Sequence, residues 1–178
     1  MEVQEAMRLI EKGVDKQSSI WADLGAGSGI FTQALNEILG FNGVIFAVDQ
    51  KLDILRDVLK TQYVRSKVHL YEENFTLPMP FLPSLDGILL ANALHYVKDQ
   101  EALLKYLLDN HLKPGGTLLV VEYDRFDADP WVPYPLPLAY FDRLASQTGM
   151  TLPEEIGRKK SIYGNQEMYA AYCHRSIN

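Results

Sequence analysis

The stretch Trp21–Phe31, WADLGAGSGIF, decides the predicted fold. Residues 20–24, apolar except for Asp23, lead into three glycines at alternate positions, namely Gly25, Gly27 and Gly29. Apolar residues then recur at helical spacing from Ile30 to Ile38, so the order predicts a strand, a tight glycine turn and a helix. Glycine adopts positive φ and lets a ligand lie against the main chain, and the first helical N–H groups point to the same crevice. We therefore expect a nucleotide-like ligand at this turn.

Predicted strands and helices alternate along the rest of the chain. A helix at 2–14, within the N-terminal segment 1–17, comes first. Five strands follow, at 19–24, 44–48, 67–71, 85–90 and 117–121, with helices at 30–39, 52–59 and 99–108. A helix from Pro137 to Gly149 precedes two more strands, 155–163 and 167–174, joined as a hairpin at Gly164-Asn165. This alternation predicts one α/β domain, 1–178, with a doubly wound, mostly parallel sheet.

Composition and charge limit the classes of partner and the cellular location that we expect. The net charge of −6 at pH 7 argues against a large basic groove, and therefore against nucleic acid. A single cysteine, Cys173, excludes an internal disulfide. The N-terminus lacks the basic character of a signal peptide, and the longest apolar run, Ile88–Val97, is too short to span a bilayer. We expect a soluble, cytoplasmic protein with no membrane partner; the sequence carries no indication of its oligomeric state.

Polar residues stand where the predicted strands end, which is where a doubly wound sheet binds its ligand. Asp49, 20 residues after Gly29, can accept hydrogen bonds from ribose hydroxyls. The dinucleotide fingerprint G-x-G-x-x-G places its third glycine where this chain has Ile30. A pyrophosphate needs no acid beside it, whereas Asp23 suits a cationic group. These details favour S-adenosylmethionine over a dinucleotide.

Four stretches carry a resemblance to a known family: ADLGAGSGIF (22–31), FAVDQ (46–50), LDGILLANALHYVKD (85–99) and HLKPGGTLLVVEYD (111–124). In order and spacing they resemble the class I S-adenosylmethionine-dependent methyltransferases, of the small-molecule, UbiE-like type. The resemblance covers about 18–124. It implies a Rossmann-like, seven-stranded sheet whose seventh strand inserts antiparallel, S-adenosyl-L-methionine as cofactor, and methyl transfer as the reaction.

The resemblance also implies the cofactor-binding residues, which are Asp23, Gly25, Ala26, Gly27, Gly29, Asp49, Gln50, Glu73, Asn74, Phe75, Ala91 and Asn92. Asp23 and the glycine turn would hold the methionine part, Asp49 the ribose and residues 73–75 the adenine. Ala91 or Asn92 would meet the amino-acid end. The adenine-side position is commonly Asp, and here it is Asn74. Either the Asn74 amide accepts from the adenine amino group without charge assistance, or Glu73 is the contact.

Simpler structural roles stand beside these. Asp23 could be a satisfied turn residue, and Asp49 could cap the next helix. His95 and Tyr96 follow the fourth strand, close to the expected methyl, and both are catalytic candidates. His95 could act as a general base, and otherwise it is a packing or wall residue. No metal site is predicted: four acids, Glu122, Asp124, Asp127 and Asp129, could attract a divalent ion, but a solvated loop is the favoured interpretation.

The methyl acceptor is left open by the sequence. The loop at 123–137 is the expected acceptor side, where Tyr123, Arg125, Trp131 and Tyr134 would either wall the acceptor pocket or anchor the loop. ANALHY (91–96) stands where the family's amide and base-amino methylating members carry Asn-Pro-Pro-Tyr, so we expect a small-molecule acceptor. Two alternatives remain: a non-catalytic protein of this fold acting through a partner, and, with less support, a nicotinamide-dependent oxidoreductase.

Overall fold

The computed structural model describes residues 1–17, 19–62, 64–160 and 166–177. Its helices are α1 (Val3–Ile10), α2 (Ile30–Leu39), α3 (Asp53–Thr61), α4 (Gln100–Asn110) and α5 (Leu138–Thr148). Its strands are β1 (Ile20–Leu24), β2 (Val44–Asp49), β3 (Lys67–Glu72), β4 (Leu85–Ala91), β5 (Leu112–Tyr123), β6 (Glu154–Lys160) and β7 (Glu167–His174). Short 3₁₀ turns lie at Glu11–Gly13, Gly40–Asn42 and Leu94–Tyr96. Among the described residues, no helix has the length and apolar character needed to cross a membrane.

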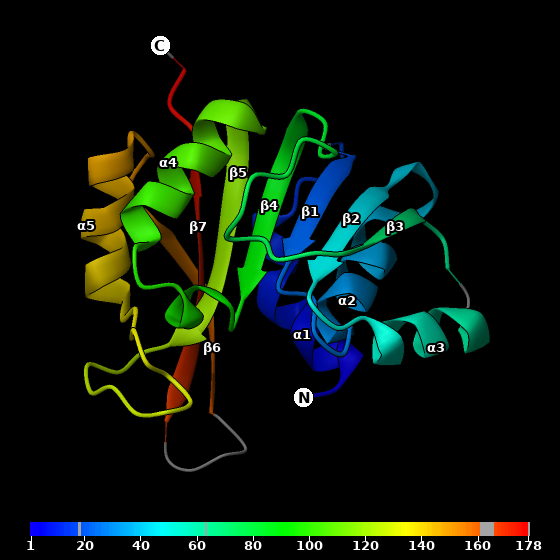
Figure 1. The fold of residues 1–178 in the computed structure, drawn as a ribbon, viewed down its shortest axis with the longest axis horizontal. Coiled ribbons are helices and arrows are strands. Elements are labelled where there is room, and N and C mark those ends of the chain that lie inside the picture. The colour runs from blue at the N-terminus through cyan, green and yellow to red at the C-terminus, as the bar shows by residue number, and fades with distance from the viewer. Residues whose placement is uncertain (18, 63, 161–165, 178) are drawn as a thin grey trace.

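The strands form one seven-stranded sheet in the order β3-β2-β1-β4-β5-β7-β6 (Figure 1). Strands β1 to β5 are mutually parallel, and β7 pairs antiparallel with both β5 and β6. The predicted Rossmann-like sheet with an antiparallel C-terminal hairpin strand is therefore confirmed. Strand order reverses between β1 and β4, where Asp23 pairs with Leu89, so the crevice at their carboxyl ends is the switch point at which such sheets bind ligands.

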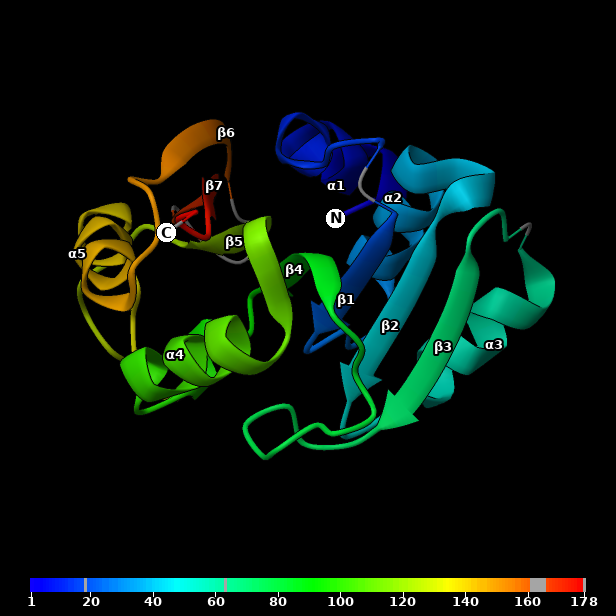
Figure 2. The ribbon, with the colours of Figure 1, turned by 90° about the horizontal axis from the view of Figure 1, so that it is seen from above.

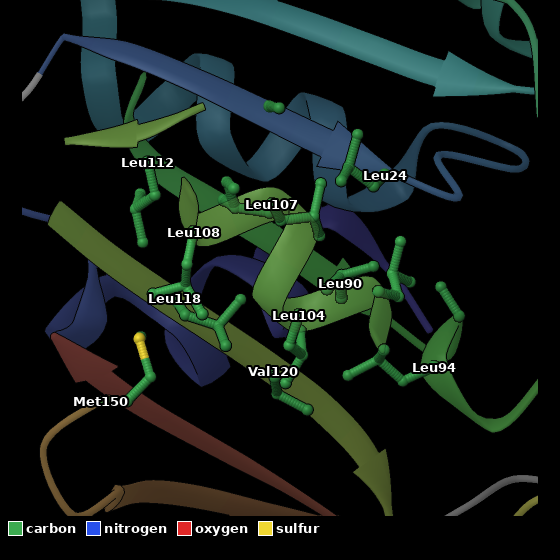
Figure 3. Packing of buried hydrophobic residues seen from close by; sticks show 14 of the residues in the cluster. Leu24, Leu90, Leu94, Leu104, Leu107, Leu108, Leu112, Leu118, Val120 and Met150 are labelled. Atoms are coloured by element: carbon green, nitrogen blue, oxygen red, sulfur yellow. The ribbon is translucent and has the colours of Figure 1, made fainter. Parts of the chain in front are cut away.

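Helices cover both faces of the sheet (Figure 2). Helices α1, α2 and α3 lie on one face, and α4 and α5 lie on the other. On the α4 side, alternate residues of β4 and β5 pack against the leucines of α4 (Figure 3), among them Leu90, Val120, Leu104 and Leu107. On the opposite face, α1 and α2 bury Ile10 and Leu35 against Trp21. Burial on both faces explains why these strands are near-continuous apolar runs.

Two predicted boundaries were wrong. The N-terminal helix is shorter than expected, because α1 ends at Ile10 and Glu11–Gly13 forms a 3₁₀ turn. Strand β5 begins at Leu112, before the predicted Pro-Gly-Gly turn; the turn is instead a bulge within the strand, with Gly115 at φ +75°. The predicted hairpin turn at Gly164-Asn165 lies outside the described residues.

Asp86 links the amino ends of three strands through hydrogen bonds and an ion pair. Its Oδ2 accepts hydrogen bonds from the N–H groups of Ser19 and Ile20 at 3.1 and 2.9 Å, and Lys113 Nζ lies 2.6 Å from Oδ1. Burial alone would raise the pKa of Asp86, but Lys113 and these N–H donors hold it below its usual range. The carboxylate thus joins β1, β4 and β5 at the edge opposite the ligand crevice.

Candidate cofactor and acceptor site

The glycine turn has the backbone that its sequence predicted. Gly25, Gly27 and Gly29 have φ of +83°, +53° and +83°, a region that other residues rarely adopt. The N–H groups of Gly25 and Ala26 donate to the carbonyl of Val48, which ties the turn to β2. Those two donors are therefore engaged within the protein. The glycines shape the crevice in two ways: they allow the positive φ of the turn, and their missing Cβ lets a ligand approach the main chain closely.

Asp23 lies at the end of β1 with 1 % of its surface exposed. Thr32 Oγ1 donates to its Oδ2 at 2.5 Å, whereas Oδ1 is buried with no hydrogen-bond partner among the described residues. Burial raises the pKa of Asp23 to about 7; the hydrogen bond from Thr32 opposes this rise, and the charge of Asp49 adds to it. A buried carboxylate oxygen without a partner is costly, which indicates that a ligand supplies its donor.

Asn92 provides a second unpartnered oxygen at the neighbouring strand end. It follows β4, its φ is +53°, and its N–H donates to Val121 O at 2.8 Å. Its Oδ1 is also buried with no partner among the described residues. Because β1 and β4 are adjacent and parallel, Asp23 and Asn92 both lie at the carboxyl ends of these strands, on the same edge of the sheet. Two acceptors, one of them a carboxylate, suit an ammonium group, and this pair of acceptors fits the methionine end of S-adenosylmethionine.

Asp49 ends β2 and faces the glycine turn. Its Oδ2 accepts from the N–H of Gly27 at 2.9 Å, and its Oδ1 accepts from the N–H of Lys51 at 3.0 Å. It does not cap α3, because the residue at that helix's N-cap is Leu52. Each oxygen keeps a free lone pair, and the carboxylate is half-buried at the crevice edge, as a ribose-binding group requires.

The predicted adenine-side residues lie on the segment after β3. Asn74 Oδ1 already accepts hydrogen bonds from the N–H and hydroxyl of Thr76, at 3.0 and 2.8 Å, and Glu73 and Gln50 are exposed. Phe75 reaches the glycine turn: a Cβ added to Gly25 would lie 3.4 Å from its Cε1 and only 2.6 Å from Ala93 Cβ. The ring of Phe75 and the methyl of Ala93 therefore close around Gly25.

A cavity of about 570 Å³ opens beside Asn92, at the carboxyl ends of β4 and β5. Its walls come from the 3₁₀ turn after β4, the end of β5 and the following loop, and they include Asn92, His95, Tyr96, Tyr123, Arg125, Asp129, Trp131, Val132 and Gln166. Three of the four loop residues proposed for the acceptor side are among them. Tyr134 is not; its N–H donates to His95 O, and its carbonyl accepts from Gln100 Nε2, so it anchors the loop. Figure 1 shows this loop at the carboxyl ends of the strands.

The four acids at the end of β5 do not form one solvated cluster, so that expectation was wrong. Glu122 is fully buried within β5 and contacts His95. Asp124 accepts from the N–H of Leu138, and Asp129 pairs with Arg125 Nη1 at 2.6 Å. Glu122, Asp124 and Asp129 thus have separate structural partners, whereas Asp127 is exposed. Sequence patterns alone did not indicate two residues of the site. Thr32 donates a hydrogen bond to Asp23, and Gln166 lines the cavity.

The fold and this crevice define a cofactor-binding α/β domain, and comparison with known proteins gives the family. A family model described as "Methyltransferase domain" matches residues 3–169. The chain therefore belongs to this family, within the class I S-adenosylmethionine-dependent methyltransferases. It is 33% identical over 112 residues to the ubiquinone/menaquinone biosynthesis C-methyltransferase UbiE of Vibrio campbellii, and 30% identical over 122 residues to that of Haemophilus ducreyi. These matches cover 61% and 66% of this chain, but only 42% and 46% of the relatives.

Solved structures share this fold. The YcgJ protein of Bacillus subtilis superposes with a TM-score of 0.75 at 13% identity, over 98% of this chain and 100% of that one. The 1,6-didemethyltoxoflavin-N1-methyltransferase of Burkholderia thailandensis, solved with S-adenosylhomocysteine, gives a TM-score of 0.74 at 16% identity, over 97% and 79% of the chains. S-adenosylmethionine is the cofactor of this class, and the buried acceptor oxygens of Asp23 and Asn92, which have no partner among the described residues, suit its ammonium group.

Proposed function

We propose that this protein transfers a methyl group from S-adenosylmethionine to a small-molecule acceptor held in the 570 Å³ cavity. One observation carries the proposal: among the described residues, buried oxygens without a partner belong to Asp23 and Asn92 at the switch point of the sheet, and Asn92 also lines that cavity. The cofactor's ammonium group would bind between Asp23 and Asn92, which would bring its methyl-bearing sulfonium toward the cavity. Two of the similar proteins are named for the biosynthesis or methylation of small molecules, which supports a small-molecule acceptor.

In this proposal the chain's own residues bind and orient. S-adenosylmethionine supplies a methyl group on a sulfonium, which is already activated toward displacement. Asp23 and Asn92 hold the amino-acid end, Asp49 the ribose, and residues 73–75 the adenine side. Gln50, Ala91 and the glycine turn line the same crevice. Alignment of the methyl with a nucleophile and exclusion of water supply most of the acceleration that such a reaction needs.

The walls of the cavity suit a neutral or anionic aromatic ligand better than a nucleic acid. Tyr96, Tyr123 and Trp131 present aromatic faces, and Arg125 brings a single cation that Asp129 already pairs. With a net charge of −6, the chain offers little attraction for a polyanion. A cytoplasmic location is proposed as well, supported by Cys173, which is buried and unpaired.

The test uses S-adenosylmethionine labelled in its methyl group and a small-molecule extract. Mass spectrometry would detect the label in an extracted compound, and S-adenosylhomocysteine would accumulate in step with it. The Asp49→Ala variant should lose this transfer, whereas Asp53→Ala, four residues later on the exposed side of α3, should keep it. S-adenosylmethionine that binds without any transfer would favour the non-catalytic alternative. Binding of NADH in its place would favour the oxidoreductase.

A further inference from the structure

Glu122 is a buried carboxylate whose hydrogen bonds, among the described residues, all go to one neighbour. It has no exposed surface. Its Oε2 lies 2.6 Å from His95 Nδ1, and its Oε1 accepts from the His95 backbone N–H at 3.2 Å. Both oxygens therefore act on a single residue, which lies on the 3₁₀ turn after the neighbouring strand β4. Removing a carboxylate from water is expensive, so this contact has to be favourable to persist.

The contact fixes which nitrogen of His95 faces the cavity. His95 is 2% exposed and lines the cavity beside Asn92. Since Nδ1 is engaged by Glu122, Nε2 is the ring nitrogen left to meet a bound molecule. The rings of Tyr96 and Tyr123 lie 4.3 and 5.9 Å from the imidazole, measured between centroids, and they flank it on the cavity side. The backbone carbonyl of His95 is held by the N–H of Tyr134 as well, so both ends of the residue are restrained.

We propose that Glu122 is a positioning residue that holds His95 as a general base, and that the acceptor is therefore a protic aromatic nucleophile, such as a phenol. This rests on the proposed function. A carboxylate on Nδ1 orients the imidazole and stabilises the imidazolium that forms when Nε2 takes a proton. A nucleophile that already carries a free lone pair, such as a tertiary amine or a thioether, would need no such base. The aromatic walls formed by Tyr96, Tyr123 and Trp131 select a planar ring.

The step balances without a further reactant. His95 Nε2 takes the hydroxyl proton of the acceptor, and the acceptor oxygen keeps the electron pair of that O–H bond. The oxygen then forms a bond to the methyl carbon, while the carbon–sulfur bond breaks and its electron pair stays on sulfur. The products are the methyl ether, neutral S-adenosylhomocysteine and a protonated His95. The His95 proton then passes to solvent, which returns the imidazole to its starting state.

The probe is 4-nitrophenol, whose anion absorbs visible light and whose neutral form does not. The wild-type protein, saturated with S-adenosylhomocysteine, is titrated with the probe at a pH where free 4-nitrophenol is mostly neutral. We expect the anion band to grow as the probe binds, since His95 takes its proton. In Glu122→Gln the bound probe should stay neutral, with the anion fraction reduced about tenfold or more, the effect of losing an adjacent charge. 4-Nitroanisole, which has no proton, should bind without that difference.

Two controls separate the possible outcomes. Asp127→Asn removes an exposed acid from the loop that follows β5, and this variant should behave as wild type. His95→Gln, which replaces the base itself, should also leave the bound probe neutral and covers the case in which Glu122→Gln fails to fold. If the probe does not bind, binds without ionising, or ionises equally in the variants, this inference is wrong. Calorimetry of S-adenosylhomocysteine on the same samples tests the proposed function separately, because that binding can succeed while the probe result fails.

Discussion

Thr32 Oγ1 donates to Asp23 Oδ2 at 2.5 Å, and the other carboxylate oxygen of Asp23 is left buried with no partner among the described residues. Thr32 lies on α2 and Asp23 on β1, so the glycine turn between them brings both to the crevice. Burial raises the pKa of this carboxyl group to about 7. A perturbed acid with one satisfied oxygen and one free oxygen is expected where a ligand brings the missing cation.

The affinity for S-adenosylhomocysteine should depend on pH through Asp23. The ammonium of the ligand prefers the ionised carboxylate, which dominates only above a pKa of about 7. Binding should therefore tighten about tenfold between pH 6 and pH 8, the change in the ionised fraction of such a group. Calorimetry at several pH values measures this. The Asp23→Asn variant should bind more weakly at every pH and show no such slope; a slope that survives the substitution would assign it to another group.

The same substitution should stabilise the unliganded protein at high pH. The pKa of Asp23 is about 7 when folded and about 4 in an unfolded chain, so the folded state holds an extra proton between these values. The free energy of unfolding contributed by this group falls as pH rises through that range, and the destabilisation is complete above pH 7. Asp23→Asn should be more stable than wild type at pH 8, on the order of 1–3 kcal/mol, and about equal at pH 4. Urea unfolding at both pH values decides it; lower stability of the variant at pH 8 would refute this explanation.

Loss of the Asp49 carboxylate should weaken cofactor binding more than it weakens the fold. Asp49→Ala removes the proposed ribose acceptor and the acceptor for Gly27 N–H. We expect a loss of about tenfold or more in S-adenosylhomocysteine affinity, and about 1 kcal/mol of stability. Asp53→Ala is the matched control, because the Asp53 side chain is 88% exposed. Equal affinities of the two variants would show that Asp49 has no role in the site.

Trp131 should matter for the acceptor alone. It is 78% exposed but lines the cavity, so Trp131→Ala should change stability by less than about 0.5 kcal/mol and leave cofactor affinity unchanged. Binding of 4-nitroanisole to the cavity should weaken several-fold. Phe126→Ala is the comparison, since Phe126 is similarly exposed and is not among the cavity walls. If both variants weaken the ligand alike, the effect belongs to the loop as a whole rather than to the cavity.

Asp86 should contribute stability that disappears in acid. Its pKa is held below the usual range, so its contribution is present above about pH 4 and is lost as pH falls through the lower, folded value. Asp86→Ala leaves the N–H groups of Ser19 and Ile20 without their acceptor and should cost about 1–3 kcal/mol at pH 7. The gap between variant and wild type should narrow below pH 4 in chemical unfolding. Cofactor binding at the opposite edge should be unchanged in the folded variant.

The sequence predicted the sheet and the positions of the strand-end polar residues well, because both depend on local patterns. Apolar runs, glycine spacing and strand-end acids recur at fixed distances, and Asp23, Asp49 and Asn92 lie where those distances place them. The resemblance added the antiparallel seventh strand, which no local pattern specifies. The Pro114-Gly115-Gly116 segment was predicted as a turn but is a bulge inside a strand, and its composition does not distinguish these two structures.

The acceptor side was harder to predict because its contacts are distant in sequence. His95 and Glu122 are 27 residues apart and meet only because β4 and β5 are neighbours. Strand alternation could have placed Glu122 inside β5, yet the acids that follow it made a solvated loop the simpler interpretation. Gln166 reaches the cavity from the start of β7, a position fixed only by the final strand order.

A crystal structure with bound S-adenosylhomocysteine tests the central claim most directly. The account predicts the ligand's amino nitrogen within about 3 Å of Asp23 Oδ1 and of the Asn92 side chain, hydrogen-bond distance. It also predicts ribose hydroxyls on Asp49, and the sulfur directed toward the cavity that His95 lines. A ligand bound away from the carboxyl ends of β1 and β4, or one that leaves Asp23 Oδ1 without a donor, would contradict it.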